Sequence, residues 1–582
     1  MTAEEIRSPL DALKARITDH LIRLYPENDL TAISDEIVSI MGFDDNLNEV
    51  HGHINLWDEK DVVAITYGDS IVEPGEHSLD TLRRFLCGNL DEVLSTVHIL
   101  PFYPYSSDDG FAVINYSEVN QSLGDWDNII ELSKDFKIMA DLVINHCSSR
   151  SLWFDNYKQG KSPGADYFIE CDPATDLSEV VRPRTSPLLR PTETLEGERH
   201  VWCTFSHDQV DLNFRNPEVL LEFVRIIKLY LDKGVSVFRL DAVAFLWKHV
   251  GTPCINLLET HEVIRLLRLL IEHHDEHALI ITETNIPSRE NLSYFGNANE
   301  AHLIYNFTLP PLLLYTMLTG DSSLLKQWMM SMPPAQNGTT YFNFIASHDG
   351  IGLRPVEDIL PDDEVDRLAS LMQSFGGDVS WRAMPDGGHR PYELNISLID
   401  ALKGTFEGED EYQLVRFVCA HAIMLALEGM PAFYIHSLFG TRNDHEKYER
   451  TSNKRAINRH NWDYHALIEA LEDDDGLHHH VFNRLTSIIE VRKAQRAFHP
   501  NATQFTMHFE ESLFAFWRQS QDRSQSIFCI YNVTNVEQSF ALKDVNLVEL
   551  DSWHDLISGH RYIDPRETVT LRPYEFVWIT NR

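Results

Sequence analysis

The sequence predicts an α/β protein whose main domain is an eight-stranded parallel (β/α)₈ barrel. Short apolar runs rich in β-branched and aromatic residues alternate with amphipathic helical segments, a pattern typical of parallel βαβ units. Eight such runs occur within roughly 380 residues, and a barrel of this type needs eight units. The runs are residues 62–67, 97–100, 138–144, 235–243, 279–283, 303–307, 341–346 and 432–435.

The chain of 582 residues is too long for one core, so further domains are expected. Residues 1–60 carry two amphipathic patterns and predict an N-terminal helical extension. Residues 148–217 are rich in proline, arginine and polar residues, which predicts a small inserted domain. Strand pairs replace the alternating pattern near the end and predict an antiparallel β-domain over residues 505–582. The barrel itself then covers residues 61–147 and 218–504.

Three strand-like runs define the predicted β-domain: residues 513–517, 526–531 and 568–578. Their apolar and aromatic residues, bounded by turn-forming segments, are typical of antiparallel strands.

Composition and charge exclude several function classes. The chain is 43% hydrophobic and 24% charged, and it lacks the apolar stretch of about 20 residues that a membrane helix needs. The N-terminus lacks the apolar core of a signal peptide, so we expect a cytoplasmic protein without a membrane partner. A formal net charge of −40 argues against nucleic acid as a partner. Seven scattered cysteines, never spaced C-x-x-C, argue against disulfides and structural zinc.

Charged side chains stand near the ends of the third and fourth runs. DLVINH contains Asp141 and His146, and FRLDAV contains Arg239 and Asp241. Arg239 lies two residues before Asp241, so both side chains face the same side of a strand. A nearby cation favours the ionised form of a carboxylate, so we expect Arg239 to hold Asp241 charged and oriented.

The fifth run ends in IITETN at Glu283, and the seventh ends in ASHD at His348 and Asp349. A barrel gathers the carboxyl ends of its strands around one mouth, where the active sites of such barrels lie. Glycosidic bond cleavage needs an anion for an oxocarbenium-like transition state and a proton for the leaving oxygen. We therefore expect Asp241 to be the nucleophile, Glu283 the general acid and base, and Asp349 a holder of sugar hydroxyls. His146 and His348 are expected to donate hydrogen bonds to hydroxyls.

These motifs resemble the four signature regions of the α-amylase superfamily, glycoside hydrolase family 13. The regions appear in order as DLVINH, FRLDAV, the glutamate of IITETN, and ASHD. From the first apolar run to the end, the chain is similar to the sucrose phosphorylase subfamily. The motifs that carry this likeness are VHILPFYPYSSDDGF, TFSHDQVDLNFR, YNFTLPPLLL, ASHDGIG, PYELNIS and RAINRH. The resemblance implies a TIM barrel and a retaining reaction through a covalent glucosyl-enzyme.

The resemblance also implies a role for each matching residue. Asp241 matches the nucleophile, Glu283 the acid/base and Asp349 the transition-state stabiliser. Asp108 and Arg459 match a pair that grips the far hydroxyls of the donor glucose. No cofactor and no metal are expected. The residues expected to bind substrate are Asp108, Phe111, His146, Phe205, Gln209, Arg239, Phe245, His348, Tyr392 and Arg459.

A phosphorylase of such acidity needs local cations to hold inorganic phosphate. Arg184, in RPRT, and Tyr392 match mobile-loop residues that contact phosphate or the leaving sugar, and an arginine supplies a charge-assisted fork. Arg354, Arg382 and Arg390 are further candidates in the long segment after the seventh run. For all four arginines, a solvated loop position is an equally good interpretation. Because phosphate must outcompete water, we expect a closed cavity.

Three positions depart from the sucrose-specific pattern. Asn285 stands where those members have a histidine that contacts phosphate or fructose. Glu393 replaces the glutamine of their YQVN pattern, and Ser347 replaces the threonine of THDGIG. TETN and YELN resemble instead the branch acting on glucosylglycerate and glucosylglycerol. Glycerate needs a further cation that the sequence does not assign, so 2-O-α-glucosylglycerol is favoured over glucosylglycerate and sucrose.

The sequence thus predicts a retaining glucoside phosphorylase that reversibly converts a small α-glucoside and inorganic phosphate to α-D-glucose 1-phosphate. An α-glucosidase or transglucosylase with the same carboxylates is the alternative, because its first half-reaction is the same. A non-catalytic protein on the same barrel is a third interpretation, and the complete set of carboxylates argues against it. The protein is expected to be a monomer or homodimer.

Overall fold

The computed structural model describes residues 8–582 except 53, 185, 384–387, 546–552 and 565. Eight strands form a closed barrel in the order β1-β18-β12-β11-β10-β9-β4-β3, which confirms the predicted barrel. Their nearly continuous burial explains why they read as apolar runs rather than alternating patterns. The strands are β1 (Val63–Thr66), β3 (Thr96–Ile99), β4 (Lys137–Val143), β9 (Val235–Asp241), β10 (Leu279–Thr282), β11 (Leu303–Tyr305), β12 (Thr340–Asn343) and β18 (Met430–Tyr434).

At least one helix separates each barrel strand from the next. Within the part of the chain that the structure describes, every helix is too short or too polar to cross a bilayer. The main helices are α3 (Ser78–Asn89), α4 (Trp126–Ser133), α6 (Pro217–Asp232), α7 (Leu258–His274), α9 (Leu309–Thr319), α10 (Ser323–Ser331), α13 (Gln413–Ala426) and α17 (Leu477–Lys493).

The chain forms two compact units, and the barrel strands are divided between them. Strands β4, β9 and β10 belong to unit 1, and β1, β12 and β18 belong to unit 2. Unit 1 comprises residues 1–54, 99–284 and 289–304, and unit 2 comprises residues 55–98, 285–288 and 305–582.

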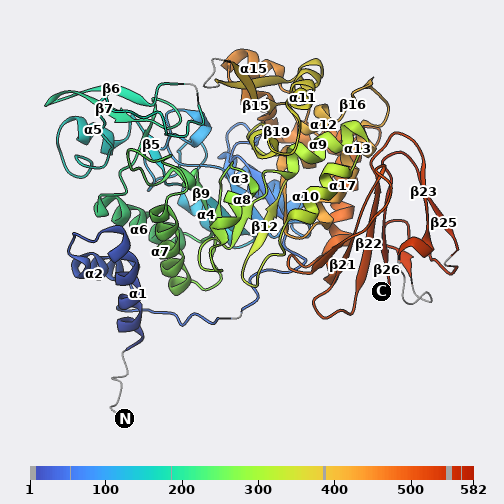
Figure 1. The fold of residues 1–582 in the computed structure, drawn as a ribbon, viewed down its shortest axis with the longest axis horizontal. Coiled ribbons are helices and arrows are strands. Elements are labelled where there is room, and N and C mark those ends of the chain that lie inside the picture. Colours follow the sequence, from blue (N-terminus) through green and yellow to red (C-terminus); the bar gives the residue numbers. More distant parts are fainter. Residues whose placement is uncertain (1–7, 53, 185, 384–387, 546–552, 565) are drawn as a thin grey trace, which may run out of the picture. The chain divides into compact units, whose positions relative to one another are not determined.

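In unit 1, the helices α1 (Pro9–Leu24) and α2 (Leu30–Met41) lie beside α6 and α7 (Figure 1). Ser8 and Asp11 form a capping box that begins α1, and Gly42 ends α2 in a left-handed conformation. The segment between β4 and α6 contains two small hairpin-like sheets. Its elements are β5 (His146–Ser148), α5 (Leu152–Lys158), β6 (Leu189–Thr194), β7 (Gly197–Trp202) and β8 (Gln209–Asp211).

In unit 2, a three-stranded antiparallel sheet of order β13-β15-β14 follows β12. The sequence analysis did not predict this sheet, because its strands carry many polar residues. Its strands are β13 (Ile351–Gly352), β14 (Asp378–Ala383) and β15 (His389–Asn395), and α11 (Asp362–Ser374) lies between the first two in sequence.

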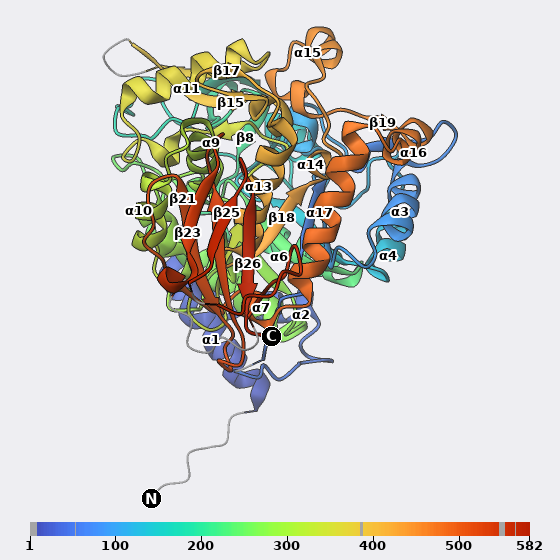
Figure 2. The same ribbon diagram turned by 90° about the vertical axis from the view of Figure 1, so that its right-hand side faces the viewer.

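The end of unit 2 is an antiparallel β-domain, as predicted, with a five-stranded sheet of order β20-β21-β22-β26-β24 (Figure 2). The predicted strand 568–578 is two strands that belong to different sheets. Tyr574, in the turn between them, has a φ of 56°. The strands are β20 (Thr503–Thr506), β21 (Leu513–Gln519), β22 (Ser526–Asn532), β23 (Gln538–Ala541), β24 (His554–Asp555), β25 (Thr568–Leu571) and β26 (Phe576–Thr580).

Candidate active site

Three carboxylates and one arginine meet at the ends of β4, β9 and β10 in unit 1. Asp141 of β4 stands directly across from Arg239 of β9, and the two side chains are paired. Arg239 Nη1 also donates to Asp241 Oδ1 at 2.8 Å, and Nη2 lies 3.9 Å from Glu283 Oε1. The arginine side chain is 2% exposed and that of Asp141 is fully buried. Because these side chains are buried away from water, the ionised form of each is stabilised mainly by the charged groups beside it.

Glu283 is held by the backbone around Asp241. Leu240 pairs with Thr282 in the parallel register, so the residues that follow them, Asp241 and Glu283, stand side by side. Ala242 N donates to Glu283 Oε2 at 3.0 Å. Ala242 has a left-handed φ of 49°, a conformation that costs energy for a non-glycine residue and is typical of functional sites.

Burial is the largest cause of a pKa of Asp241 well above its ordinary value; Arg239 opposes this shift, and the neighbouring carboxylates Glu283 and Asp141 add to it. Two adjacent carboxylates tend to share one proton, since both cannot ionise easily in a buried site. Arg239 is closer to Asp241 than to Glu283. The guanidinium therefore stabilises a negative charge on Asp241 more than one on Glu283.

A polar group lies beside this cluster in unit 1. Gln209, on β8, places its Nε2 3.2 Å from Asp108 Oδ2, from Phe111 O and from His146 Nε2. His146 Nε2 lies 3.0 Å from Phe111 O, and burial lowers the pKa of this histidine. Asp108 lies in a left-handed turn, closed by Gly110, where a Cβ atom would stand 2.6 Å from Pro101 O. The group offers donors and acceptors for hydroxyls.

Aromatic rings adjoin the polar group. The Phe205 ring lies 5.3 Å from that of His146 and 5.5 Å from that of Phe245. The Arg184 guanidinium lies 5.9 Å from the Phe205 ring, and that of Arg239 lies 5.7 Å from the Phe111 ring. Such faces suit the apolar side of a sugar ring. Unit 1 thus brings together Asp108, Phe111, His146, Arg184, Phe205, Gln209, Arg239, Asp241, Phe245 and Glu283.

The remaining predicted residues lie in unit 2: His348 and Arg459 lie near Asp349, and Tyr392 lies on β15. Asp349 Oδ1 lies 2.5 Å from Arg455 Nη1 and 3.8 Å from Arg459 Nη2, and its Oδ2 lies 3.6 Å from His348 Nε2. Arg459 Nε donates to His348 O at 2.8 Å, and the guanidinium lies 5.4 Å from the Tyr67 ring. The expected pairing of Arg459 with Asp108 joins the two units and stays a prediction.

The three candidate arginines of unit 2 differ in their partners, and two of them, Arg382 on β14 and Arg390 on β15, lie on strands rather than in a loop. Arg382 pairs with Glu357 at 2.7 Å, and Arg390 pairs with Asp362. The side chain of Arg354 is partly buried but makes no hydrogen bond, ion pair or ring contact with any residue that the structure describes. Arg354 follows Leu353, whose N–H donates to the carbonyl of Tyr392, on β15, at 2.9 Å.

The sequence analysis gave no role to Arg455 or to Lys248. Arg455 lies in RAINRH, four residues before Arg459, so the motif contained the signal. Lys248 is buried in unit 1, where Nζ lies 2.6 Å from Asp211 Oδ2 and donates to Asn145 Oδ1 at 2.6 Å. Burial lowers the pKa of Lys248. This network holds Asn145, the residue before His146. No motif in the sequence indicates it.

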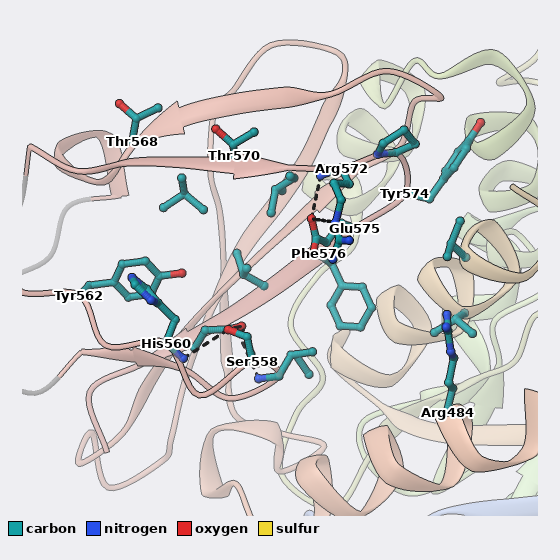
Figure 3. Close-up of a pocket in the computed structure, with 18 of the residues that line it drawn as sticks. Arg484, Ser558, His560, Tyr562, Thr568, Thr570, Arg572, Tyr574, Glu575 and Phe576 are labelled. Atoms are coloured by element: carbon teal, nitrogen blue, oxygen red, sulfur yellow. Dashed lines mark hydrogen bonds and ion pairs between the residues drawn. The ribbon is translucent and has the colours of Figure 1, made fainter. Parts of the chain in front are cut away.

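A separate cavity of about 620 Å³ lies in unit 2 (Figure 3). Thr568 and Thr570 line it from β25, and Arg484 lines it from α17. Its carboxylates are engaged locally: Glu575 pairs with Arg572, and Glu567 pairs with His560. None of the expected catalytic residues lines this cavity, so it is not the candidate active site.

Comparison with known proteins defines the family. The α-amylase catalytic-domain profile matches residues 93–352. The chain is 42% identical over 531 residues to glucosylglycerate phosphorylase of Spirochaeta thermophila, covering 90% of each chain. It is also 42% identical over 526 residues to glucosylglycerate phosphorylase of Escherichia coli, covering 90% of this chain and 92% of the relative.

More distant relatives are also named as phosphorylases. Glucosylglycerol phosphorylase of Marinobacter adhaerens is 29% identical, covering 77% of this chain and 89% of the relative. The crystal structure of sucrose 6F-phosphate phosphorylase from Thermoanaerobacter thermosaccharolyticum superposes with a TM-score of 0.70 at 26% identity, covering 81% and 94% of the two chains. The chain belongs to the α-amylase family, glycoside hydrolase family 13. Within that family it groups with the phosphorylases named here, which confirms the predicted family and enzyme class.

Proposed function

We propose that the protein is a retaining phosphorylase that converts glucosylglycerate and inorganic phosphate, reversibly, to α-D-glucose 1-phosphate and glycerate. The observation that carries the proposal is the 42% identity to two glucosylglycerate phosphorylases over 90% of the chain. The sequence analysis favoured glucosylglycerol, but the relative with that activity is 29% identical. The comparison therefore supports glycerate, rather than glycerol, as the leaving group.

In the proposed first half-reaction, the Asp241 carboxylate attacks the anomeric carbon while Glu283 gives its proton to the departing glycerate oxygen. In the second, phosphate attacks the glucosyl-enzyme, and Glu283 takes the proton of the attacking phosphate hydroxyl. Two displacements at one carbon leave the product in the α configuration. The pairing of Arg239 with Asp241 supports this division of roles.

The binding roles follow the groups described above. We assign Asp108, His146 and Gln209 to the hydroxyls of the glucose, and Phe205 to its apolar face. Asp349, with His348 and Arg459 near it, is proposed to hold hydroxyls more tightly as positive charge develops at the anomeric carbon. Arg184 and Tyr392 are proposed to contact phosphate.

Arg354 supports an anionic leaving group. A partly buried arginine that has no counter-ion among the described residues loses hydration and gains nothing from them in return, which is unfavourable unless a ligand supplies the anion. We assign Arg354 to the glycerate carboxylate. This is the cation that the sequence analysis left unassigned.

The test offers glucosylglycerate, glucosylglycerol and sucrose separately, each with phosphate, and measures glucose 1-phosphate and free glucose. We expect glucose 1-phosphate from glucosylglycerate, with the highest kcat/KM of the three donors. Free glucose without glucose 1-phosphate from every donor would instead support the α-glucosidase or transglucosylase alternative. A higher kcat/KM with glucosylglycerol would overturn the choice of leaving group.

A further inference from the structure

Arg455 joins two carboxylates that lie on different segments of unit 2. Its Nε and Nη2 donate to Glu393 Oε1 and Oε2 at 3.0 and 2.7 Å. Its Nη1 lies 2.5 Å from Asp349 Oδ1. One edge of the guanidinium is therefore fixed by a two-point fork, and Nη1, which takes no part in the fork, lies against the proposed stabiliser.

Glu393 is well placed to fix the arginine. It lies on the central strand β15, opposite Gly352 of β13 and Ser380 of β14, and it is 4% exposed. A Cβ atom at Gly350 would stand 2.5 Å from Glu393 Cγ, so the loop that carries Asp349 passes tightly over this side chain. Neither the carboxylate nor the loop can move without displacing the other.

The charges explain why a second carboxylate is useful here. Arg459 Nη2 lies 3.8 Å from the same Asp349 oxygen that Arg455 contacts. Without Glu393, two guanidinium groups would face one carboxylate and cancel the negative charge that an oxocarbenium-like transition state needs. Glu393 offsets one of the two positive charges.

We propose that Glu393 is a positioning residue that holds Arg455 and, through it, sets the place and the effective charge of Asp349. The role assigned to Asp349 rests on the proposed function, and the control of that role by residue 393 goes beyond it. A glutamine at this position, as in the sucrose-specific pattern, has one acceptor oxygen and an amide donor. Because the amide nitrogen cannot accept, glutamine cannot reproduce the fork in which each carboxylate oxygen accepts one hydrogen bond from Arg455.

The test is a double-mutant cycle between positions 393 and 349. Glu393→Gln and Arg455→Lys are each expected to lower kcat about 10- to 100-fold with a smaller change in KM, because the lost interaction acts in the transition state. α-D-Glucosyl fluoride serves as donor, since its good leaving group keeps weak variants measurable. Adding Glu393→Gln to Asp349→Asn should then change kcat/KM by less than about twofold.

Glu357→Gln is the matched control, because it breaks a similar carboxylate–arginine pair in the same segment without contact to Asp349. Its kcat/KM should stay at the wild-type value. A Glu393→Gln enzyme with wild-type kcat, or one whose effect is equally large in the Asp349→Asn background, would overturn the proposal. The midpoints of thermal unfolding identify a variant that has lost its fold. If Glu393→Gln is such a variant, Arg455→Lys tests the proposal in its place.

This outcome is separable from the proposed function. If the wild-type enzyme hydrolyses glucosyl fluoride but forms glucose 1-phosphate from no donor, the phosphorylase assignment fails. The coupling between Glu393 and Asp349 is still measured in that hydrolysis. If phosphorolysis is found and the coupling is absent, only the positioning role fails.

Discussion

Arg239 contacts two carboxylates, Asp141 and Asp241, that have different roles. Asp141, fully buried, pairs with its Nη1 group and holds the guanidinium at the strand end. The same group donates to Asp241. Because its positive charge is divided, Arg239 orients Asp241 without cancelling the negative charge that a nucleophile needs.

Replacing Asp241 by asparagine should remove glucosyl transfer and leave the fold intact. Asparagine has nearly the same size and still accepts from Arg239, but it cannot form the covalent ester. We expect kcat to fall by at least about 10⁴-fold, the scale of removing a nucleophile. Glucose 1-phosphate assays and circular dichroism measure the two effects. An active Asp241→Asn enzyme would refute the assignment.

Replacing Arg354 by glutamine should separate acidic from neutral substrates. Loss of one charged hydrogen bond is worth about 1.5–3 kcal/mol, so kcat/KM for glucosylglycerate should fall roughly 10- to 100-fold. The kcat/KM for glucosylglycerol should change little. Arg390→Gln is the control, since Arg390 already pairs with an exposed Asp362. An equal loss with both donors would assign Arg354 to phosphate or to the fold instead.

The residues proposed to be catalytic can be singled out in the sequence because each follows an apolar run and lies in a recognisable motif. The pairing of Glu393 with Arg455 cannot, because the two residues are 62 positions apart and pair only after the three-stranded sheet forms. No local pattern marks which arginine of RAINRH receives a carboxylate. Pairings across such distances depend on the tertiary structure rather than on spacing.

The helices α1 and α2 support the helices that precede the two catalytic strands. Leu13, Ile17 and Leu21 of α1 are buried. The Oε1 atom of Glu262, on α7, lies 2.7 Å from His20 Nδ1 and 2.9 Å from Arg23 Nη1, both on α1. Burial raises the pKa of Glu262, but hydrogen bonds from His20, Arg265 and Arg23 hold it below its usual value. The N-terminal extension is thereby tied to the helix before β10.

Replacing Glu262 by glutamine should destabilise unit 1. Two arginines and a histidine lose their carboxylate partner in a largely buried place, which costs about 1–3 kcal/mol. Asp35→Asn is the control, because the Lys14–Asp35 pair between α1 and α2 is exposed to solvent, which weakens it. Thermal midpoints compare the two variants. Equal midpoints would show that the Glu262 network adds no stability.

The barrel strands were predictable because strands buried on both faces are apolar throughout. The sheet β13-β15-β14 was not, since its exposed side carries Trp381 and polar residues that match no simple alternation. The division of residues 568–578 into β25 and β26 was also missed. A turn between two apolar segments leaves little signal when each segment has only four or five residues.

Several histidines in both units are buried in the neutral form. Burial lowers the pKa of His302 in unit 1 and of His421 in unit 2 to about 4, and that of His436 to about 3. Ile280 N donates to His302 Nδ1 at 3.0 Å, so the ring proton lies on Nε2, 3.2 Å from Glu272. These rings stay neutral in the folded protein because their buried surroundings do not hydrate a protonated imidazolium.

Stability should therefore fall as the pH falls below the ordinary histidine value of 6.5. Between 6.5 and about 4 the unfolded chain binds protons that the folded chain does not, so protonation favours unfolding. Each histidine contributes roughly 2–3 kcal/mol to this loss. Thermal midpoints from pH 7.5 to 4.5 measure it, and His302→Asn, which keeps an acceptor for Ile280, should reduce the slope. The exposed His277→Asn should not. A midpoint independent of pH would contradict this expectation.

The backbone hydrogen bond from Ala242 to Glu283 has a spectroscopic consequence. Ala242 N donates to Glu283 Oε2. The amide proton thus belongs to the residue after the proposed nucleophile, and its acceptor is the carboxyl group that is proposed to give and take a proton in each turnover. A hydrogen bond to an ionised carboxylate is stronger than one to a neutral acid. The Ala242 amide resonance should therefore shift downfield when Glu283 is ionised. A single labelled alanine would report the protonation state of the acid/base without any change to the catalytic residues.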